Sequence, residues 1–237
     1  MIEGVKAVIF DVFGTLVDWR GSVARQAQTV LEPLDIHLDW PAFADAWRGE
    51  YQGAMEEVRS GRLPFSKLDL LHRRNLDIVL ARLGLDETQV PESARQTLNL
   101  AWHQLDAWPD VGAALQDLRT RYRLAPCSNG NISLMVDLAR HNGWHWDAIL
   151  GAEVAGDYKP KPAVYLKACE ALDLQPHQVM MVAAHSDDLK AAAACGLRTG
   201  FVARPLEYGG LRVEDRPTVP VDLFLGSSLI LPSAQSA

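Results

Sequence analysis

An aspartate follows an apolar stretch near the start of the chain, within Asp11-Val12-Phe13-Gly14-Thr15-Leu16. Residues 5–10 are mostly apolar and partly β-branched, which predicts a buried parallel strand that ends at Asp11. Open α/β sheets bind their ligands at the carboxyl ends of strands, so Asp11 is placed to act as a nucleophile. Gly14 and Thr15 allow a tight turn and supply N–H and hydroxyl donors. Taken alone, a turn-forming aspartate after a core strand would be the better interpretation.

Three further polar motifs occur beside predicted strands, in an order that favours a shared site. They are Ser128-Asn129-Gly130 after the second strand, Lys159 before the fourth strand, and His185 with Asp188 after it. Because parallel strands end at the same edge of a sheet, these groups are expected to converge on one crevice. A carboxylate nucleophile, a hydroxyl and amide pair, an ammonium and a second carboxylate form a coherent catalytic set. Lys159 is expected to lower the pKa of Asp11 and keep it able to attack.

Each of these residues also has a simple structural alternative. Lys159 is compatible with a solvated loop lysine, and Ser128 and Asn129 with the N-cap of the next helix. His185 suits a hydrogen bond to a loop carbonyl, as well as a role as donor or as base near neutral pH. The presence of all the motifs in the expected order favours the catalytic interpretation.

Helical periodicity dominates the part of the chain that follows the first strand. Apolar residues recur at helical spacing around residues 21–34, 41–59, 64–83 and 87–105. No strand signal interrupts these stretches. The whole region is therefore expected to be a helical insert.

From about Pro109 the pattern changes to helices that alternate with short strands. The strands predicted after the first one are 124–127, 148–150, 179–183, 199–202 and 223–225. This alternation indicates an α/β fold, a doubly wound parallel sheet with helices on both faces. The predicted domains are a catalytic core of residues 1–17 and 105–237 and an α-helical cap of residues 18–104. The cap would lie above the carboxyl edge of the sheet as a lid.

Composition places the chain among ordinary globular proteins. It has 237 residues, of which 48% are hydrophobic and 22% charged, and a formal net charge of −7 at pH 7. This acidic balance argues against nucleic-acid or membrane partners, but it does not exclude a small anionic substrate. The three cysteines lack metal-ligand spacing and favour a reducing compartment. With no signal peptide or bilayer-spanning apolar run recognised, the cytoplasm is the expected location.

The four motif residues Asp11, Ser128, Lys159 and Asp188 match those of the haloacid dehalogenase superfamily, which the chain resembles over nearly its full length. More narrowly, it resembles the type II (S)-2-haloacid dehalogenases. The resemblance implies a Rossmann-like core with an α-helical cap. It also implies that Asp11 attacks a short 2-haloalkanoate and forms an aspartyl ester. Water, activated by Asp188 with Lys159 and His185, would then release the 2-hydroxy acid.

Three details carry the narrower resemblance. Phosphatases of the superfamily have a general-acid aspartate at the position of Phe13, but a halide leaves as a weak base and needs no proton. Phosphatases also have an acidic residue at the position of Ala184, which helps to bind Mg²⁺. The segment 46–51 is similar to the family stretch that carries a substrate-binding arginine, which would be Arg48.

The resemblance also implies a set of substrate- and halide-binding residues. These are Phe13, Thr15, Arg48, Phe65, Ser128, Asn129 and Tyr165. Ser128 would hold the substrate carboxylate together with backbone N–H groups and Thr15. Arg48 and Asn129 would stabilise the departing halide. Phe65 matches its family position only across a small gap.

The chain departs from the common family pattern around the catalytic histidine. Ala183-Ala184-His185 replaces a frequent Ser-Ser-Asn, so a hydroxyl and an amide near the hydrolytic water are missing. Phe13 replaces a more typical tyrosine. This version of the motif resembles a branch that includes enzymes able to release fluoride from fluoroacetate. A strong C–F bond would demand well-aimed donors around the departing fluoride.

These observations predict a hydrolase that acts on carbon–halide bonds, takes a short 2-haloalkanoate, releases halide and needs no metal or other cofactor. The main alternative is a Mg²⁺-dependent small-molecule phosphatase of the same superfamily. A catalytically silent binding protein on the same fold is a third possibility. A homodimer is an expectation from the resemblance alone.

Overall fold

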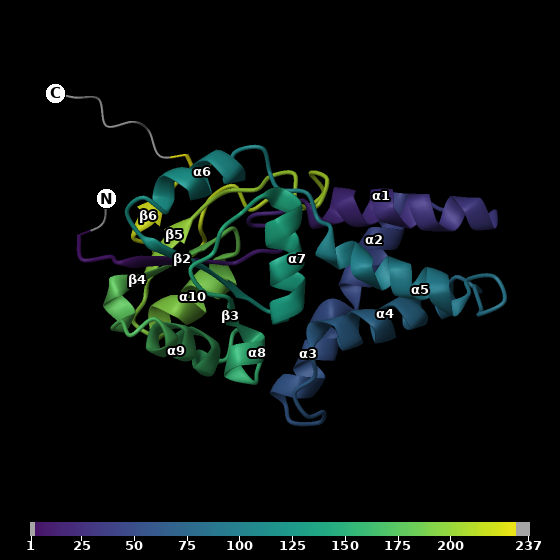
Figure 1. Ribbon diagram of the computed structural model, residues 1–237, viewed down its shortest axis with the longest axis horizontal. Coiled ribbons are helices and arrows are strands. Elements are labelled where there is room, and N and C mark those ends of the chain that lie inside the picture. The colour runs from purple at the N-terminus through teal and green to yellow at the C-terminus, as the bar shows by residue number, and fades with distance from the viewer. Residues whose placement is uncertain (1–2, 231–237) are drawn as a thin grey trace.

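A six-stranded parallel sheet forms the centre of the protein in the computed structural model, which describes residues 3–230 (Figure 1). In spatial order its strands are β3 (Leu150–Gly151), β2 (Arg123–Ser128), β1 (Ala7–Phe10), β4 (Val179–Ala183), β5 (Arg198–Phe201) and β6 (Leu223–Phe224). Every neighbouring pair is parallel, as predicted. The carboxyl ends of β1, β2, β4 and β5 therefore meet at one edge, which is where the sequence places its polar motifs.

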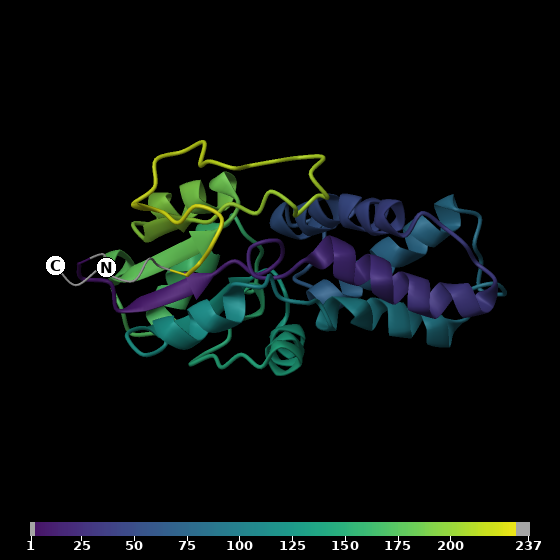
Figure 2. The same ribbon diagram turned by 90° about the horizontal axis from the view of Figure 1, so that it is seen from above.

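Helices cover both faces of this sheet. They are α6 (Val111–Leu118), α7 (Ile132–Asn142), α8 (Ala152–Ala155), α9 (Pro162–Ala171), the 3-10 turn η3 (Pro176–Gln178) and α10 (Ser186–Ala194). Val8 and Phe10 pack with α6 and α7, whereas Ala7 and Ile9 pack with α9 and α10. This alternation follows from the two-residue period of a strand. Figure 2 shows α9 and α10 in green on one side of the sheet and α6 in teal on the other. The doubly wound α/β prediction is confirmed.

The segment between β1 and α6 forms a group of helices beside the sheet (Figure 1). These are α1 (Trp19–Leu31), η1 (Glu32–Leu34), α2 (Trp40–Gly49), α3 (Tyr51–Arg59), α4 (Leu68–Arg82), α5 (Glu92–Asn99) and η2 (Leu100–His103). The single helix predicted over 41–59 is in fact two helices that meet at Glu50, directly after the weak helix former Gly49. The helix predicted from residue 64 begins only at Leu68, because Pro64 and its neighbours form a loop.

Two chain crossings connect the helical region to the sheet, and they run side by side. Val17 forms an antiparallel bridge with Ala107. The Asp18 N–H donates to the Asp106 carbonyl at 2.9 Å, and the Trp108 N–H donates to the Leu16 carbonyl at 3.0 Å. The two crossings are thus hydrogen-bonded to each other as a paired hinge.

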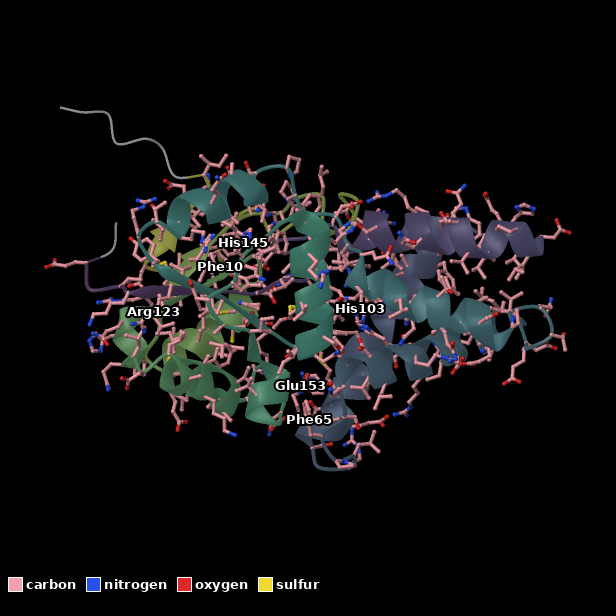
Figure 3. All side chains as sticks on the ribbon, viewed as in Figure 1. Phe10, Phe65, His103, Arg123, His145 and Glu153 are labelled. Carbon is pink, nitrogen blue, oxygen red and sulfur yellow. The ribbon has the colours of Figure 1, made fainter. Side chains whose placement is uncertain are left out.

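Side-chain contacts also join the two regions on either side of this hinge. Lys67 forms an ion pair with Glu153 at 2.8 Å, and the Tyr158 hydroxyl donates to the Ser66 carbonyl at 2.5 Å. Figure 3 shows Glu153, Phe65 and His103 at the junction between the helical region and the core. The helical region is therefore held against the carboxyl edge of the sheet.

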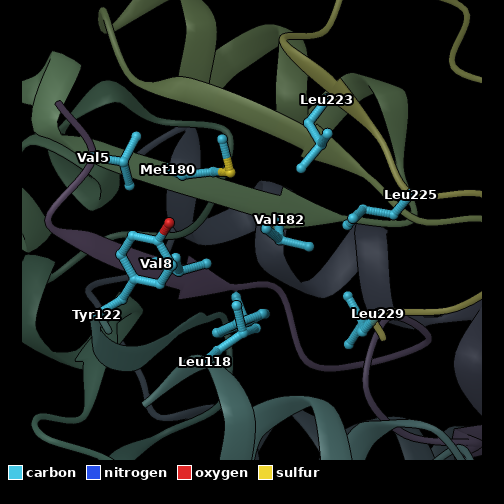
Figure 4. A pocket seen from close by; sticks show the side chains of 10 residues that line it. Val5, Val8, Leu118, Tyr122, Met180, Val182, Leu223, Leu225 and Leu229 are labelled. Carbon is cyan, nitrogen blue, oxygen red and sulfur yellow. The ribbon is translucent and has the colours of Figure 1, made fainter. Parts of the chain in front are cut away.

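An apolar cavity of about 160 Å³ lies on the α6 face of the sheet, away from this edge (Figure 4). Side chains of β1, β4, β6 and α6 line it, among them Val8, Leu118 and Met180. Its lining offers no titratable group besides the Tyr122 hydroxyl, so it supplies packing surface and little chemistry. Across residues 3–230, none of the helices combines the length and the hydropathy needed to cross a membrane.

Candidate active site

The carboxylate of Asp11 lies at the end of β1 with three hydrogen-bond partners. Lys159 Nζ donates to Oδ1 at 2.8 Å, and the Thr15 hydroxyl donates to Oδ2 at 2.7 Å. Nδ1 of His185 lies 3.1 Å from the same Oδ2. Asp11 is only 6% exposed. Burial alone would raise the pKa of Asp11, but Lys159 and His185 together hold that pKa well below its ordinary value. Asp11 is therefore an anion.

Lys159 connects Asp11 to the second carboxylate, Asp188. Its Nζ donates to Asp188 Oδ2 at 2.5 Å, and the Tyr165 hydroxyl donates to Asp188 Oδ1 at 2.6 Å. The two carboxylates raise the pKa of Lys159 against the effect of burial, so Lys159 is a stable cation. Burial and the nearby charge of Asp11 raise the pKa of Asp188 above its ordinary value. The pair thus consists of one firmly anionic carboxylate and one with a higher proton affinity.

The turn after β1 is fixed from three directions. Thr15 accepts a bond from the Ala184 N–H at 2.9 Å while it donates to Asp11. Nε of Arg204 donates to the Thr15 carbonyl at 2.9 Å. Gly14 has a φ of 84°, which favours glycine. The turn that carries Asp11 is therefore held by several hydrogen bonds, and Thr15 takes part in two of them.

Asn129 and Ser128 lie at the end of β2, as predicted. The Asn129 Oδ1 accepts a bond from the Lys159 N–H at 2.9 Å, so its amide NH₂ is left to face the cavity. Ser128 is fully buried, and its hydroxyl accepts from the Gly130 N–H at 3.0 Å. A Cβ at Gly151 would approach the Ser128 carbonyl to 2.1 Å, so the neighbouring strand requires glycine there.

The guanidinium of Arg48 extends from α2 into a cluster of aromatic rings. It lies 3.8 Å from the centroid of Tyr51, 5.3 Å from Trp19 and 5.6 Å from Phe13. Its buried Nη1 has no hydrogen-bond partner among the described residues. An arginine donor in this state is available to an anion that enters the cavity.

A cavity of about 640 Å³ opens between the helical region and the carboxyl edge of the sheet. Among the residues predicted for the site, Asp11, Phe13, Arg48, Asn129, Lys159, Tyr165, His185 and Asp188 line it. Thr15 and Ser128 do not line it, because both are fully buried beneath it. Phe65 does not line it either, since its ring packs on Tyr158 with centroids 5.5 Å apart.

Two residues that the sequence analysis did not single out belong to this site. Arg59 lines the cavity, and its Nη1 donates to the Lys159 carbonyl at 2.8 Å. Glu207 accepts from the Trp19 indole N–H at 3.0 Å and lies 2.9 Å from Nε2 of His185. Glu207 lies in the loop that follows β5, six residues beyond the end of the strand, so the strand-end rule that predicts the other motifs does not reach it.

Among residues 3–230, no group of three or more His, Cys, Asp or Glu side chains is arranged to hold a metal ion. The side chains of Phe13 and Ala184 offer no oxygen ligands, and the carboxylates of Asp11 and Asp188 both bind Lys159. These side chains therefore supply an octahedral Mg²⁺ site poorly.

A family model described as haloacid dehalogenase-like hydrolase matches residues 5–196. The chain belongs to this hydrolase family. The solved structure of the defluorinating L-2-haloacid dehalogenase Rha0230 is 42% identical, with a TM-score of 0.91, over 93% of this chain and 90% of that one. The structure of the L-2-haloacid dehalogenase PA0810 is 46% identical, with a TM-score of 0.88, over 95% of this chain and 96% of that one.

Curated relatives are more distant but cover the chain equally well. The (S)-2-haloacid dehalogenase 4A of Burkholderia cepacia is 27% identical over 88% of each chain. Phosphoglycolate phosphatases are also among the relatives, and one from Psychrobacter arcticus is 28% identical over 92% of each chain. The resemblance to the haloacid dehalogenases that the motifs indicated is thus confirmed.

Proposed function

We propose that this hydrolase converts short 2-haloalkanoic acids, such as haloacetates and (S)-2-halopropionate, to 2-hydroxy acids through an aspartyl ester on Asp11. The observation that carries the proposal is the Asp11 carboxylate, bonded to Lys159 at 2.8 Å, which faces the same cavity as the Arg48 donor that has no partner among the described residues. A nucleophile and an anion-binding donor across one cavity suit the displacement of a halide. The relatives at 42% and 46% identity are L-2-haloacid dehalogenases, which supports the same chemistry.

In the first step a carboxylate oxygen of Asp11 attacks C2 of the substrate from the side opposite the halogen. The C–X bond breaks, and its electron pair leaves with the halide. Arg48 and the Asn129 amide stabilise the departing anion, within the wall that includes Phe13. Because a halide is a weak base, an apolar residue at position 13 costs this step nothing.

In the second step water attacks the carbonyl carbon of the Asp11 ester. Asp188 takes the water proton, for which its raised pKa suits it, and Lys159 and Tyr165 orient its carboxylate. The ester C–O bond of Asp11 breaks and the 2-hydroxy acid leaves with inverted configuration at C2. Asp188 returns the proton it took to the departing alkoxide oxygen. The second proton of the water is released to solvent as Asp11 becomes a carboxylate again.

The proposal includes an arrangement of domains. Residues 1–17 and 105–237 form the catalytic core, and residues 18–104 form a cap that supplies Arg48 and excludes water when substrate binds. The hinge pairing of Val17 with Ala107 supports these boundaries. Three unpaired cysteines suit the cytoplasm. We also propose a homodimer and no cofactor.

The decisive experiment measures halide release from chloroacetate and (S)-2-chloropropionate in EDTA, beside p-nitrophenyl phosphate hydrolysis with Mg²⁺. We expect halide release without metal, and none from an Asp11→Asn variant. Phosphate release that requires Mg²⁺, without halide release, would instead support the phosphatase alternative. A parallel assay with fluoroacetate tests whether the range includes the C–F bond, as it does for a relative described as defluorinating.

A further inference from the structure

The buried carboxylate of Glu207 binds the ring nitrogen of His185 that faces away from Asp11. It does not itself take part in either proposed step. Nδ1 of His185 faces Asp11 Oδ2 at 3.1 Å, while Nε2 faces both oxygens of Glu207 at 3.1 and 2.9 Å. Asp11 and His185 follow the ends of β1 and β4, and Glu207 lies in the loop after β5. They form a continuous chain from carboxylate to imidazole to carboxylate.

Hydrogen-bond chemistry decides the protonation of this chain. An ionised carboxylate only accepts, so each ring nitrogen of His185 must carry a proton to bond its partner. Oε1 of Glu207 also accepts from the Trp19 indole at 3.0 Å, so this carboxylate is an acceptor on two sides. His185 is therefore an imidazolium between two anions. The charges of Glu207 and Asp11 raise the pKa of His185 well above its ordinary value, although burial opposes this.

The surrounding loops leave space for the side chain of Glu207. It is only 4% exposed, and a Cβ at Gly14 would lie 2.1 Å from its Oε1. The turn after the nucleophile therefore needs glycine both for its positive φ and for the approach of this carboxylate. The small cavity beside His185 is also lined by the charged or titratable groups Arg204, Tyr208, Arg212 and Glu214. Of these, Arg204 is paired with Asp110 at 2.8 Å.

We propose that Glu207 is a positioning residue that keeps His185 doubly protonated and directed at Asp11 while Asp11 is esterified. The inference rests on the proposed function. Once Asp11 is an ester it has no charge, so within residues 3–230 Glu207 is the one carboxylate that stays bonded to His185. The imidazolium N–H then stabilises the oxyanion that forms when water attacks the ester carbonyl. His185 acts as a donor in this step and not as the base.

This positioning role predicts that loss of the Glu207 charge slows ester hydrolysis but not the alkylation of Asp11. A Glu207→Gln variant leaves Asp11 its bond to Lys159, so we expect alkylation of Asp11 to keep its rate. Ester hydrolysis at pH 8 should slow at least about tenfold, because a neutral imidazole is a weaker donor. The ester should then accumulate, and its hydrolysis should lose rate above the ordinary histidine pKa of about 6.5. The wild-type rate should stay level between pH 6 and pH 8.

The experiment is rapid quench with chloroacetate, in which intact-protein mass reports the ester, halide reports alkylation and glycolate reports hydrolysis. Glu207→Asp should restore hydrolysis in part, and Glu170→Gln, on the exposed side of α9, serves as control. Equal slowing of both half-reactions, or no slowing, would overturn the positioning role. Absence of halide release by the wild-type protein in EDTA would instead overturn the proposed function.

A second measurement does not depend on how the variant folds. The ¹⁵N chemical shifts of the His185 ring in the wild-type protein report the proton on each nitrogen. We expect both nitrogens to be protonated at pH 8. A single protonated nitrogen at that pH would overturn the inference.

Discussion

The buried guanidinium of Arg48 has a donor atom with no hydrogen-bond partner within residues 3–230. Two nearby arginines have oxygen partners: Arg59 binds a backbone carbonyl, and Arg204 binds Asp110. Arg48 is instead enclosed by aromatic rings, with Nη1 unpartnered within residues 3–230. A desolvated donor without a partner costs free energy, and a bound anion recovers that cost. The sequence alone favours an ordinary helix arginine here, and only the resemblance indicated its role.

The residue-scale prediction is that Arg48→Lys slows dehalogenation because lysine lacks the planar fork of donors that follows a departing halide. We expect kcat with chloroacetate to fall about 100-fold, the magnitude typical for one lost donor to a developing anion. The loss should be larger with fluoroacetate than with bromoacetate, since fluoride needs the most stabilisation. Arg62→Lys, at an exposed position, is the control. Equal losses across the three halides would contradict a role at the leaving group.

At the scale of elements, His103 links the helical region to the core. It lies on η2, with Nδ1 2.7 Å from Asp137 on α7 and Nε2 3.1 Å from Asp69 on α4. Asn131 donates to the same Asp69 at 2.8 Å. Burial lowers the proton affinity of His103, but the two carboxylates outweigh it and raise its pKa above the ordinary value. His103 therefore links α4 to α7 through two hydrogen bonds that favour its protonated form.

The raised pKa of His103 makes the free energy of unfolding depend on pH, with more stabilisation at low pH than at high pH. Because the folded pKa of His103 exceeds the unfolded value of about 6.5, its contribution is complete below that pH. The contribution is lost as pH rises through the folded pKa. We expect His103→Gln to destabilise the protein by about 1 kcal/mol at pH 6, since solvent at Asp137 screens the pair. The difference from wild type should shrink toward pH 9.

Urea unfolding at pH 6 and pH 9 measures both values. The exposed His177→Gln on η3 is a matched control, for which the two values should not differ from wild type. A difference for His103→Gln that stays constant or grows with pH would show that His103 is not a charged link.

Elements predicted from periodicity differ in how well they agree with the structure, for a physical reason. The strand predicted at 179–183 has the observed bounds because it is a buried run of apolar residues, two of them β-branched, that begins directly after polar residues. The sequence of the helical region shows the right periodicity but does not reveal the break at Glu50, which depends on how Trp47 and Tyr51 both pack inward. The orientation of the Phe65 ring depends on the path of its loop, so its contact with Tyr158 could not be predicted from the sequence.

The same distinction holds for the site. Residues at strand ends follow from topology, and so the parallel sheet brings Asp11, Lys159 and Asp188 within hydrogen-bond distance, as predicted. Glu207 lies six residues beyond β5, and its contact with His185 depends on the path of the intervening loop. Burial of Ser128 depends on Gly151 of the neighbouring strand. Such tertiary contacts leave no periodic signal in the sequence.

At the scale of the whole molecule, the cavity is lined from both regions. Arg48, Tyr51 and Arg59 come from the helical region, whereas Asn129 and Lys159 come from loops of the core. A ligand that binds residues of both the helical region and the core must stabilise the contact between these two regions. The hinge and the contact between Lys67 and Glu153 already connect the two regions, so we expect them to unfold together.

The prediction is tested on Asp11→Asn, which should bind haloacetate without turning it over. At a chloroacetate concentration of 100 Kd, binding should stabilise the folded state by about 2.7 kcal/mol. For a chain of this size that corresponds to a rise in Tm of about 5–10 °C, in a single transition. Neutral chloroacetamide, which has nearly the same shape but no carboxylate, should give a much smaller rise. Scanning calorimetry decides between the outcomes, because two transitions of which only one moves would mean that the ligand contacts one region alone.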